Sequence, residues 1–553
     1  MSQTESSTST DSVDRTPVED ADVCIVGAGP AGAHVAHTLA SEGHEVVVLE
    51  AGPRFDMESR VDRMKTQIHP SDPVTDIWDM GGDRDAYSSS GDIDVPLNKR
   101  RVKGVGGTSL HWGSVTPRLR ERDFEMDSRH GVGVDWPISY SDLQPYYAET
   151  EQEIGVAGPN DAAHQPPREE DYPMDGLDPS YTDQLFAEAG EALDIDVQTL
   201  PMAINTGAYD RSECQGYGTC EHVCPSGAKY TAEIHVDLAE DEGATVIDQV
   251  PVQRLVHGPD GEEVTEAVYV TPDGTEHSQT ADLFVAAAGA YETPRLLLLS
   301  DSDQYPDGLA NSSSTVGRYL MDHPYAAVIG VLPDENTHQG EYGPIVSSGV
   351  YQYYDLDEDA TRGGINIMLI NNASPSPAEM AIGNTAIGDE LLEQVDAQFG
   401  STFGLVMVVE MLPDEENRIT LDESTTDDHG NPVPDVSLSG DEFAQNAMEE
   451  GISVGEDLIE EAGGNAVYGE GTVTASESQM IEQIRGGYHP LGGTRMGTDP
   501  EESVVDENLK AHDLGNLYIA SGGVFPTAGA ANPTLTIMAL ARRCGEYIHE
   551  NEL

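Results

Sequence analysis

Short apolar runs separated by glycine turns and helical patterns recur along the chain. The first run spans 22–26 and enters a glycine-rich turn, a helical pattern follows over 33–41, and a second apolar run spans 46–49. Later strand-like runs cover 244–247, 267–270, 283–287 and 517–520. Strands that alternate with helices predict a parallel sheet.

Two helices are expected to begin beside proline residues. The run at 283–287 meets Gly289, and a Leu-rich helix is predicted to start near Arg295, with Thr293 and Pro294 as its start signals. The last helix of the chain is predicted to follow Pro533.

Other segments follow different patterns. Residues 139–155 and much of 340–482 leave the strand–helix alternation, and the second segment is rich in alternating strand-like runs. A chain of 553 residues is long enough for two or more domains. We therefore expect an α/β protein, α+β overall, in which a Rossmann-like domain with a parallel sheet is interleaved with a domain built on an antiparallel sheet.

The first glycine-rich turn carries candidate binding chemistry. It reads Gly27-Ala-Gly29-Pro-Ala-Gly32, and the second apolar run ends at Glu50. In this strand–turn–helix–strand setting, the first glycine makes a tight turn, the second lets the backbone approach a pyrophosphate, and the third lets the helix pack on the strand. Glu50 lies where a carboxylate would accept a hydrogen bond from an adenosine ribose. The pattern predicts dinucleotide binding.

Charge changes the picture of the surface. The net charge is −74, from 101 acidic and 27 basic residues. Because the acids are spread between apolar strands, we expect a folded halophilic protein in a salt-filled cytoplasm, where self-repulsion is screened. Such a surface disfavours nucleic acid and anionic membrane as partners. No apolar run approaches ~20 residues, so no membrane-spanning helix is predicted, and the first residues resemble a disordered acidic tail rather than a signal peptide.

Two loops near the end of the chain supply candidate catalytic groups. One runs from Gly486 to Gly497 and carries His489, and the other reads Ala-Ala-Asn532-Pro533-Thr-Leu-Thr. A neutral histidine suits the removal of a hydroxyl proton, because its pKa lies near working pH. Asn532 has a second interpretation as the N-cap of a helix with Pro533 in its first position, and both roles are compatible.

Three of the five cysteines are clustered. Cys214, Cys220 and Cys224 lie within eleven residues and end in Cys-Pro, which favours a metal or cluster site over a dispersed disulfide framework. An iron–sulfur cluster is the first interpretation, a zinc site completed by His222 is the second, and plain thiols or a loop-closing disulfide remain. Cys24 and Cys544 are expected to be buried structural thiols.

Taken together, these motifs resemble the glucose-methanol-choline (GMC) oxidoreductase family of FAD enzymes, and the match runs nearly end to end. Further motifs are Arg101-Val-Lys-Gly-Val-Gly106-Gly107-Thr108-Ser109-Leu-His111-Trp112, Gly289-Ala-x-x-Thr-Pro-Arg-Leu-Leu, and Val316-Gly-Arg-Tyr-Leu-Met-Asp-His323-Pro. The Gly-Thr-Ser-Leu-His-Trp stretch and Asp135-Trp-Pro-Ile-Ser-Tyr are similar to the branch with gluconate, fructose and FAD-glucose dehydrogenases and pyranose oxidases. The resemblance implies FAD as cofactor and a hydroxyl of a sugar, polyol or sugar acid as hydride donor.

The resemblance also implies roles for particular residues. His489 would be the base that accepts the hydroxyl proton while hydride passes to flavin N5, and Asn532 would hold the same oxygen. His111 would either be bonded covalently to the flavin or form a non-covalent wall of its pocket. The expected cofactor-binding residues are Gly27, Gly29, Gly32, Glu50, Gly106, Gly107, Thr108, Ser109, His111, Trp112, Val252, Gly289, Gly522, Gly523 and Thr534.

The cysteine stretch bears on the electron acceptor. It is similar to a three-cysteine stretch that binds a three-iron, four-sulfur (3Fe-4S) cluster in bacterial FAD-glucose dehydrogenases, although five residues separate its first two cysteines. The resemblance therefore implies a dehydrogenase that passes electrons to a protein or quinone acceptor, alongside a small subunit or cytochrome. The alternatives are an FAD alcohol oxidase acting on a sterol or sugar with oxygen, and a flavoprotein that only ferries electrons.

By this likeness the chain divides into six segments. Residues 1–18 form the expected disordered tail. Residues 19–130, 205–330 and 484–553 are expected to build the FAD-binding domain. Residues 131–204 and 331–483 are expected to build the substrate-binding domain.

Overall fold

The computed structural model describes most of the chain, in seven stretches. These are residues 14–66, 77–332, 343–357, 359–370, 381, 385–467 and 487–553. The beginning of the predicted tail, part of the segment 340–482 and Gly486 lie outside the described residues.

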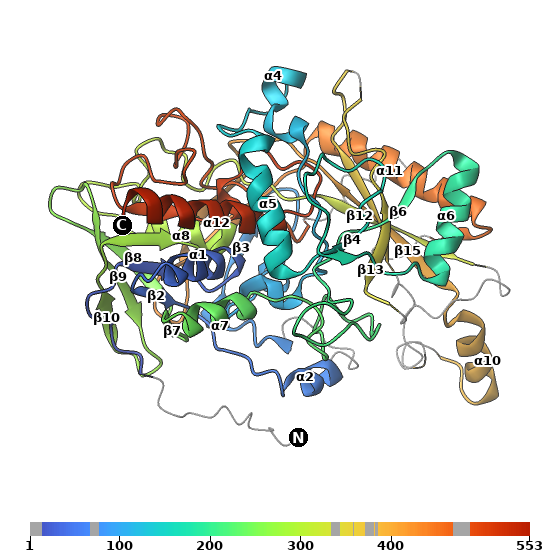
Figure 1. Ribbon diagram of the computed structural model, residues 1–553, viewed down its shortest axis with the longest axis horizontal. Coiled ribbons are helices and arrows are strands. Elements are labelled where there is room, and N and C mark those ends of the chain that lie inside the picture. The colour runs from blue at the N-terminus through green and yellow to red at the C-terminus, as the bar shows by residue number, and fades with distance from the viewer. Residues whose placement is uncertain are drawn as a thin grey trace.

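A five-stranded parallel sheet forms one half of the molecule (Figure 1). Its strand order is β19-β11-β1-β2-β7. The strands are β1 (Val23–Val26), β2 (Val46–Leu49), β7 (Thr245–Ile247), β11 (Leu283–Ala286) and β19 (Leu517–Ile519). β1, β2 and β11 are buried along their whole length, as expected for a sheet covered on both faces.

Helices pack around this sheet. α1 packs against α7 and α12, and α12 also packs against α5. Their bounds are α1 (Pro30–Ser41), α5 (Tyr140–Ile154), α7 (Glu233–Asp241), α8 (Gly289–Leu299) and α12 (Thr534–Asn551). The predicted helix near Arg295 therefore begins earlier than expected, at Gly289, and Pro294 lies inside it rather than at its start.

The second half of the molecule is built on a six-stranded antiparallel sheet with the order β18-β12-β15-β14-β13-β6 (Figure 1). Its strands are β6 (Val197–Thr199), β12 (Tyr325–Val331), β13 (Val346–Val350), β14 (Ile365–Ile370), β15 (Thr402–Val409) and β18 (Asn465–Val467). α11 (Glu442–Glu461) packs on β12, β14 and β15 and also against α6 (Tyr181–Leu193). The expected mixed fold, with a parallel and an antiparallel sheet, is confirmed.

Two three-stranded sheets flank the parallel sheet. β8 (Val252–His257), β9 (Val264–Val270) and β10 (Glu276–Gln279) form an antiparallel meander, so the run at 267–270 is not part of the parallel sheet. The other sheet joins β3 (Ser88–Ser90) to the hairpin of β16 (Arg418–Thr426) and β17 (Pro432–Ser437), which packs on α8.

Smaller elements complete the description. They are α2 (Arg60–Thr66), α4 (Met126–His130), α10 (Asp389–Gln398), β4 (Ala157–Gly158), β5 (Met174–Asp175) and the 3₁₀ turns Gly107–His111 and Gly522–Val524.

The disordered tail predicted for residues 1–18 extends too far towards the C-terminus, because its last residues are ordered. The Arg15 guanidinium pairs with Asp248 at 2.8 Å, and Gln279 accepts the N–H of Val18 and donates to its carbonyl. Tyr269 also donates a hydrogen bond to the carbonyl of Arg15. These contacts fix residues 15–18 against the β8–β10 meander.

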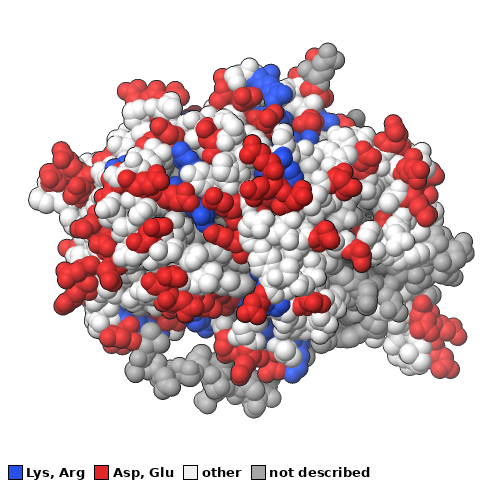
Figure 2. All heavy atoms as spheres, in the orientation of Figure 1, with Lys and Arg blue, Asp and Glu red and all other residues white. Residues whose placement is uncertain are grey.

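Acidic side chains are spread over the face seen in Figure 2, and basic ones are few there. Several of the arginines are buried in ion pairs instead. Arg118 and Glu151, for example, are both almost fully buried and lie 2.7 Å apart. In the described part of the chain, no helix has the length and apolar character needed to cross a bilayer.

Candidate active site

One large cavity runs between the first glycine turn and the two C-terminal loops. Its volume is about 1070 Å³. Gly27, Gly29 and Glu50 line one part of it, and His489 and Asn532 line another. Side chains of the antiparallel sheet, among them Met368 and Val406, close it from the other side. The cavity therefore connects the predicted nucleotide-binding turn with the predicted catalytic loops.

The glycine turn is shaped by close backbone contacts. Gly27 has φ +107°, and a Cβ on Gly32 would lie 1.9 Å from the carbonyl oxygen of Gly27. A Cβ on Gly29 would instead meet nothing nearer than the Cα of Gly107 at 3.9 Å, and Gly29 lines the cavity. Gly32 thus serves the packing of α1 on β1, while Gly29 leaves room for a ligand next to the backbone.

Glu50 stands at the end of β2 with its carboxylate against the glycine turn. Its Oε2 accepts the N–H of Ala28 and its Oε1 accepts the N–H of Gly52, both at 2.9 Å. Burial raises the pKa of Glu50 to about 7, and these amides oppose the shift. The carboxylate is therefore held at the cavity wall by two backbone amides.

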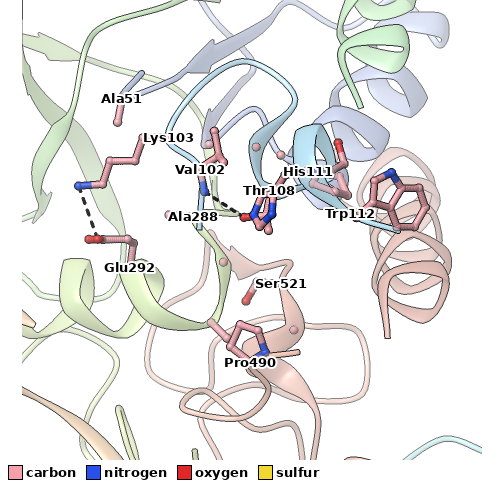
Figure 3. A pocket seen from close by; sticks show the side chains of 18 of the residues that line it. Ala51, Val102, Lys103, Thr108, His111, Trp112, Ala288, Glu292, Pro490 and Ser521 are labelled. Atoms are coloured by element: carbon pink, nitrogen blue, oxygen red, sulfur yellow. Dashed lines mark hydrogen bonds and ion pairs between the residues drawn. The ribbon is translucent and has the colours of Figure 1, made fainter. Parts of the chain in front are cut away.

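The loop before α4 supplies a second wall (Figure 3). Ser109 donates to the carbonyl of Gly106 and accepts the N–H of Ala232, which fixes the 3₁₀ turn Gly107–His111. Trp112 donates through Nε1 to the carbonyl of Tyr230 at 2.8 Å. Both ring nitrogens of His111 are buried and have no hydrogen-bond partner, and burial lowers its pKa to about 3. His111 is therefore a neutral imidazole at the cavity wall with its nitrogens available.

His489 and Asn532 meet at the catalytic end of the cavity. Asn532 Nδ2 lies 3.2 Å from His489 Nε2, and Asn366 on β14 donates to Asn532 Oδ1 at 3.3 Å. The two loops, more than 40 residues apart in sequence, are thus brought together as the sequence predicts. Asn532 does not cap α12, because Pro533 is the N-cap residue and makes no side-chain cap contact. The capping interpretation of Asn532 is wrong.

Asp322 and His323, which belong to the motif 316–324 but had no role predicted for them, hold His489 in place. His323 Nδ1 lies 3.0 Å from His489 Nδ1, and His323 Nε2 lies 3.4 Å from the carbonyl of Ala528. Because a carbonyl can only accept, His323 carries its proton on Nε2, and its Nδ1 accepts the Nδ1–H of His489. The lone pair of His489 then sits on Nε2, facing Asn532. Asp322 Oδ1 accepts the backbone N–H groups of both histidines.

Burial keeps both rings neutral. It lowers the pKa of His489 well below its usual value, with His323 and Arg100 adding to the effect. It also lowers the pKa of His323 to about 4. A buried, neutral His489 whose lone pair lies on Nε2 is suited to accept a proton from a hydroxyl group.

An aromatic and cationic group stands beside this pair. The Arg100 guanidinium lies 3.8 Å from the ring centroid of Tyr488 and 5.5 Å from that of Tyr325. Tyr325 and Tyr488 line the cavity. The sequence does not predict this group, because Arg100 and Tyr325 stand just outside the quoted motifs and nothing in the loop of His489 links Tyr488 to them.

The remaining predicted residues fall into two groups. Those that line the cavity are Gly107, Thr108, Val252, Gly289, Gly522 and Thr534. Those outside its lining are Gly32, Gly106 and Gly523. A Cβ on Gly106 would lie 2.8 Å from Glu233, and one on Gly523 would lie 2.6 Å from Thr494, so both serve close packing behind the wall.

The cysteine stretch lies beside the same wall, and all five cysteines are free thiols. Lys229 is buried, and its ammonium donates to the carbonyls of Leu110, Trp112 and Cys220. Burial raises the pKa of Cys220 to about 11. Burial opposes ionisation of Cys224 as well, but the N–H of Lys229 and the Ser226 hydroxyl hold its pKa below the usual range.

The spacing of these thiols bears on the kind of metal centre. Within the described residues, Cys214, Cys220, Cys224 and His222 contribute no set of three ligand atoms within 4.8 Å of one another. Four ligands of one zinc ion lie about 3.8 Å apart when they are thiolates, because Zn–S bonds are about 2.3 Å long. The thiolate ligands of an iron–sulfur cluster lie farther apart, because the inorganic core of the cluster separates them.

A parallel sheet whose first glycine turn opens into a large cavity, with a neutral histidine and an asparagine at the other end, defines a dinucleotide-dependent oxidoreductase. Residues 22–72 match a family model described as FAD dependent oxidoreductase. Residues 97–325 and 413–541 match models described as GMC oxidoreductase. The chain belongs to the GMC oxidoreductase family.

Individual relatives agree with this assignment. The chain is 33% identical to the fructose dehydrogenase large subunit of Gluconobacter japonicus, over 96% of this chain and 97% of the relative. It is 30% identical to 2-methyl-1,2-propanediol dehydrogenase of Mycolicibacterium austroafricanum, with 96% of each chain covered. Among solved structures, formate oxidase of Aspergillus oryzae RIB40 has the same fold, with a TM-score of 0.69 at 17% identity, covering 98% of this chain and 99% of that one.

The cavity fits FAD. It is long enough to join the glycine turn to the catalytic pair, and a Cβ on Gly29 would point into otherwise open space. The N-terminus of α12 faces the cavity through Pro533 and Thr534, so its free N–H groups favour a group with negative charge. Gly29 and Glu50 would hold the nucleotide end, and His111, Trp112 and Thr534 would surround the ring end.

Proposed function

We propose that this protein oxidises a hydroxyl group of a sugar, polyol or sugar acid to a carbonyl group. FAD bound in the cavity supplies the acceptor for the hydride. His489 Nε2 takes the hydroxyl proton, and Asn532 Nδ2 donates a hydrogen bond to the same oxygen. The single observation that carries this proposal is the 3.2 Å approach of these two atoms at the cavity wall.

The neighbours of His489 support its role as base. His323 Nδ1 accepts a hydrogen bond from the Nδ1–H of His489, and this keeps the lone pair of His489 on Nε2. As the substrate proton arrives, the imidazolium shares its Nδ1–H with His323, and the buried carboxylate of Asp322 lies at the backbone of both residues. Asn366 donates to Asn532 Oδ1 and so directs the NH₂ group of Asn532 towards His489 Nε2, where the substrate hydroxyl would bind.

The relatives support the class of substrate. One is described as a fructose dehydrogenase and another as a diol dehydrogenase, so both act on compounds that carry hydroxyl groups. Tyr325 and Tyr488 offer flat faces and hydroxyl groups beside His489, which suits a sugar ring.

We further propose that electrons leave through a 3Fe-4S cluster held by Cys214, Cys220 and Cys224, to a protein or quinone acceptor. The N–H groups directed at Cys224 and the ammonium of Lys229 stabilise negative charge at this position. Lys229 also donates to the carbonyl of Trp112, so the stretch is tied to the cavity wall. The name of the fructose dehydrogenase relative as a large subunit supports a partner subunit here as well.

The first experiment is anaerobic reduction of the holoenzyme by a panel of aldoses, polyols and aldonates at high salt. Bleaching of the flavin by one of them is the expected result, and no bleaching by any member would overturn the proposed substrate class. Fast hydrogen peroxide formation on admission of air would instead favour the oxidase alternative.

A second experiment tests the cluster. Iron and acid-labile sulfide are expected in purified protein and are expected to be absent from Cys220→Ser. The variant should still be bleached by substrate but should no longer pass electrons to a quinone acceptor. Zinc in place of iron, or equal acceptor activity in the variant, would contradict the proposal.

The two roles of His111 remain to be separated. If FAD is attached covalently to His111, the yellow colour should stay with the protein after acid precipitation. In His111→Asn the colour should be released, and the variant should fold and bind FAD, but less tightly than the wild type. If the colour of the wild type never survives acid precipitation, His111 is a wall of the pocket only.

A further inference from the structure

The antiparallel sheet presents an apolar face to the cavity beside the reacting pair. Strands β12, β13, β14 and β15 all contribute side chains to the cavity wall. In the described part of these strands, Tyr325 carries the one polar group on this wall, and the other side chains are those of Ala327, Val346, Met368, Ile370, Val406 and Val408. The proposed reaction uses none of these apolar side chains.

The alternation of side chains along β15 separates this face from the one that α11 covers. Leu405 and Met407 point at α11, because a Cβ on Gly455 of that helix would lie 3.7 Å and 2.2 Å from them. Val406 and Val408 therefore point to the opposite face, towards the cavity. Apolar sheet faces are normally covered by another element, yet three of these side chains are only half-buried, those of Ala327, Ile370 and Val406. A molecule bound in the cavity would cover them.

The strand register orders this face into rows that lead away from the reacting pair. In the first row, Val408 is paired with Tyr325 on β12 and with Asn366 on β14. Asn366 donates a hydrogen bond to Asn532, so this row lies at the reacting position. The first row is also the one that carries the polar side chains.

The two rows beyond it are apolar. In the second row, Val406 is paired with Ala327 on β12 and with Met368 on β14. In the third row, Ile370 is paired with Val346 on β13. Successive rows on one face of a sheet lie about 7 Å apart, so the apolar rows reach about 14 Å from the polar one.

A free sugar does not match this face. It carries hydroxyl groups around its whole ring, and a hydroxyl group placed against Val406 or Met368 would lose water without gaining a hydrogen-bond partner there. A hydrocarbon group in the same place would cover the half-buried side chains and would be stabilised by the hydrophobic effect. The face therefore suits a molecule that is polar at one end only.

We propose that the substrate is a sugar or polyol that carries an alkyl or aryl substituent. This rests on the proposed function, because it takes His489 and Asn532 as the reacting pair. The hydroxyl group that reacts belongs to the polar part of the substrate, at the first row, and the substituent lies on the second and third rows. Val406 and Met368 then determine specificity, since they lie next to the polar row.

The test measures binding separately from turnover. The unreactive probes are straight-chain primary amides from acetamide to octanamide, titrated calorimetrically into the oxidised holoenzyme. Kd should fall with chain length, by up to about fourfold for each methylene group that is buried. A Kd that does not depend on chain length, or no binding of any amide, would overturn the proposal.

Turnover is then compared within matched pairs of compounds. Each sugar or polyol is tested with and without a hexyl substituent, and kcat/KM should be higher for the hexyl derivative. If free sugars bleach the flavin but amide affinity does not depend on chain length, the proposed substituent is wrong and the proposed function stands. If amide affinity rises with chain length but no compound with a hydroxyl group bleaches the flavin, the proposed function is wrong.

Two variants of similar side-chain volume locate the substituent. Val406→Thr and Met368→Gln each place a polar group in the second row, so their loss of affinity relative to the wild type should grow with chain length. The control is Val197→Thr on β6, a substitution of the same kind in the same sheet but outside the cavity lining. It should keep the wild-type dependence on chain length.

The variants also separate the substituent from a rival occupant of the apolar rows. A dependence on chain length in Val406→Thr equal to that of the wild type would overturn the proposal. If that result came with an altered flavin absorption spectrum, the apolar rows would be assigned to the flavin ring instead.

Discussion

His489 is the residue on which the proposed chemistry depends. His489→Asn keeps a hydrogen-bonding group of similar polarity but removes the basic nitrogen. We expect kcat to fall by on the order of 10²–10⁴ because general-base catalysis contributes about that much. Steady-state kinetics with an artificial electron acceptor measures the loss, and the flavin spectrum serves as the control for folding. A variant with wild-type kcat would contradict the assignment of the base.

The buried position of His489 sets the pH dependence. Its pKa is lowered in the folded protein, so the neutral, basic form persists below the range in which a free histidine becomes protonated. We therefore expect kcat/KM to stay constant from neutral pH down through the usual histidine pKa near 6.5 and to fall only at lower pH. A pH–rate profile with its acidic limb at or above that value would contradict this environment.

His323 should act by positioning His489. In His323→Leu, the Nδ1–H of His489 loses its acceptor, so the ring is free to turn and to exchange its tautomer. A loss of about 10²-fold in kcat is expected, as for a small misplacement of a catalytic group. His323→Gln, which restores an acceptor, should recover part of the rate and shift the acidic limb of the pH profile. Equal kcat values for Leu and Gln would reduce His323 to a packing role.

The sequence predicts the pair of side chains that the structure brings together, but not the residues that support them. His489 and Asn532 stand in glycine-rich loops whose residue types indicate chemistry. Asn366 lies in an ordinary buried strand, and no local pattern marks it. Asp322 belongs to the motif 316–324, but it acts through backbone N–H groups, so its residue type does not indicate its role. Their roles depend on which segments of the chain meet in space, and a single sequence does not show this.

At the scale of the elements, the glycine turn allows a matched pair of substitutions. Gly32→Ala would place a Cβ 1.9 Å from the carbonyl oxygen of Gly27, so α1 must move away from β1. We expect the free energy of unfolding to fall by about 1–3 kcal/mol or more. Gly29→Ala, at φ −79°, meets no close protein atom and should keep wild-type stability.

The two variants should differ in cofactor binding. The methyl group of Gly29→Ala projects into the cavity, so FAD affinity should fall although the fold is retained. Urea unfolding of both apoproteins and FAD titration measure the two effects. If Gly29→Ala binds FAD as the wild type does, the turn does not approach the cofactor.

Element positions followed from the sequence where apolar runs were bounded by glycine. β1, β2, β11 and β19 lie within a residue of the predicted runs. The run at 267–270 was assigned to the wrong sheet, because apolar character does not say which neighbour a strand pairs with. Proline is a common start signal, but α8 begins at Gly289 and accommodates Pro294 in its interior, so the predicted start is wrong.

On the scale of the whole molecule, acidic and basic side chains are distributed differently between the surface and the interior. Acidic groups are spread over the face seen in Figure 2, whereas buried arginines such as Arg118 and Arg122 pair with buried glutamates. The composition predicts the excess of acidic residues. It does not predict that many of the few basic residues are buried in the interior. Most of the surface carboxylates therefore have no basic partner to neutralise them.

This imbalance predicts a salt requirement for folding. Between 0.01 M and 1 M salt the Debye length falls from about 30 Å to about 3 Å, so repulsion among the surface carboxylates is progressively screened. With a net charge of −74, the melting temperature should rise steeply over this range in KCl. Differential scanning calorimetry of the holoenzyme at fixed FAD concentration measures the curve. Replacing the exposed acids of α10 by their amides should shift the melting curve towards lower salt; these acids are Asp389, Glu390 and Glu393. A wild-type melting temperature that does not depend on KCl would show that surface repulsion does not limit stability.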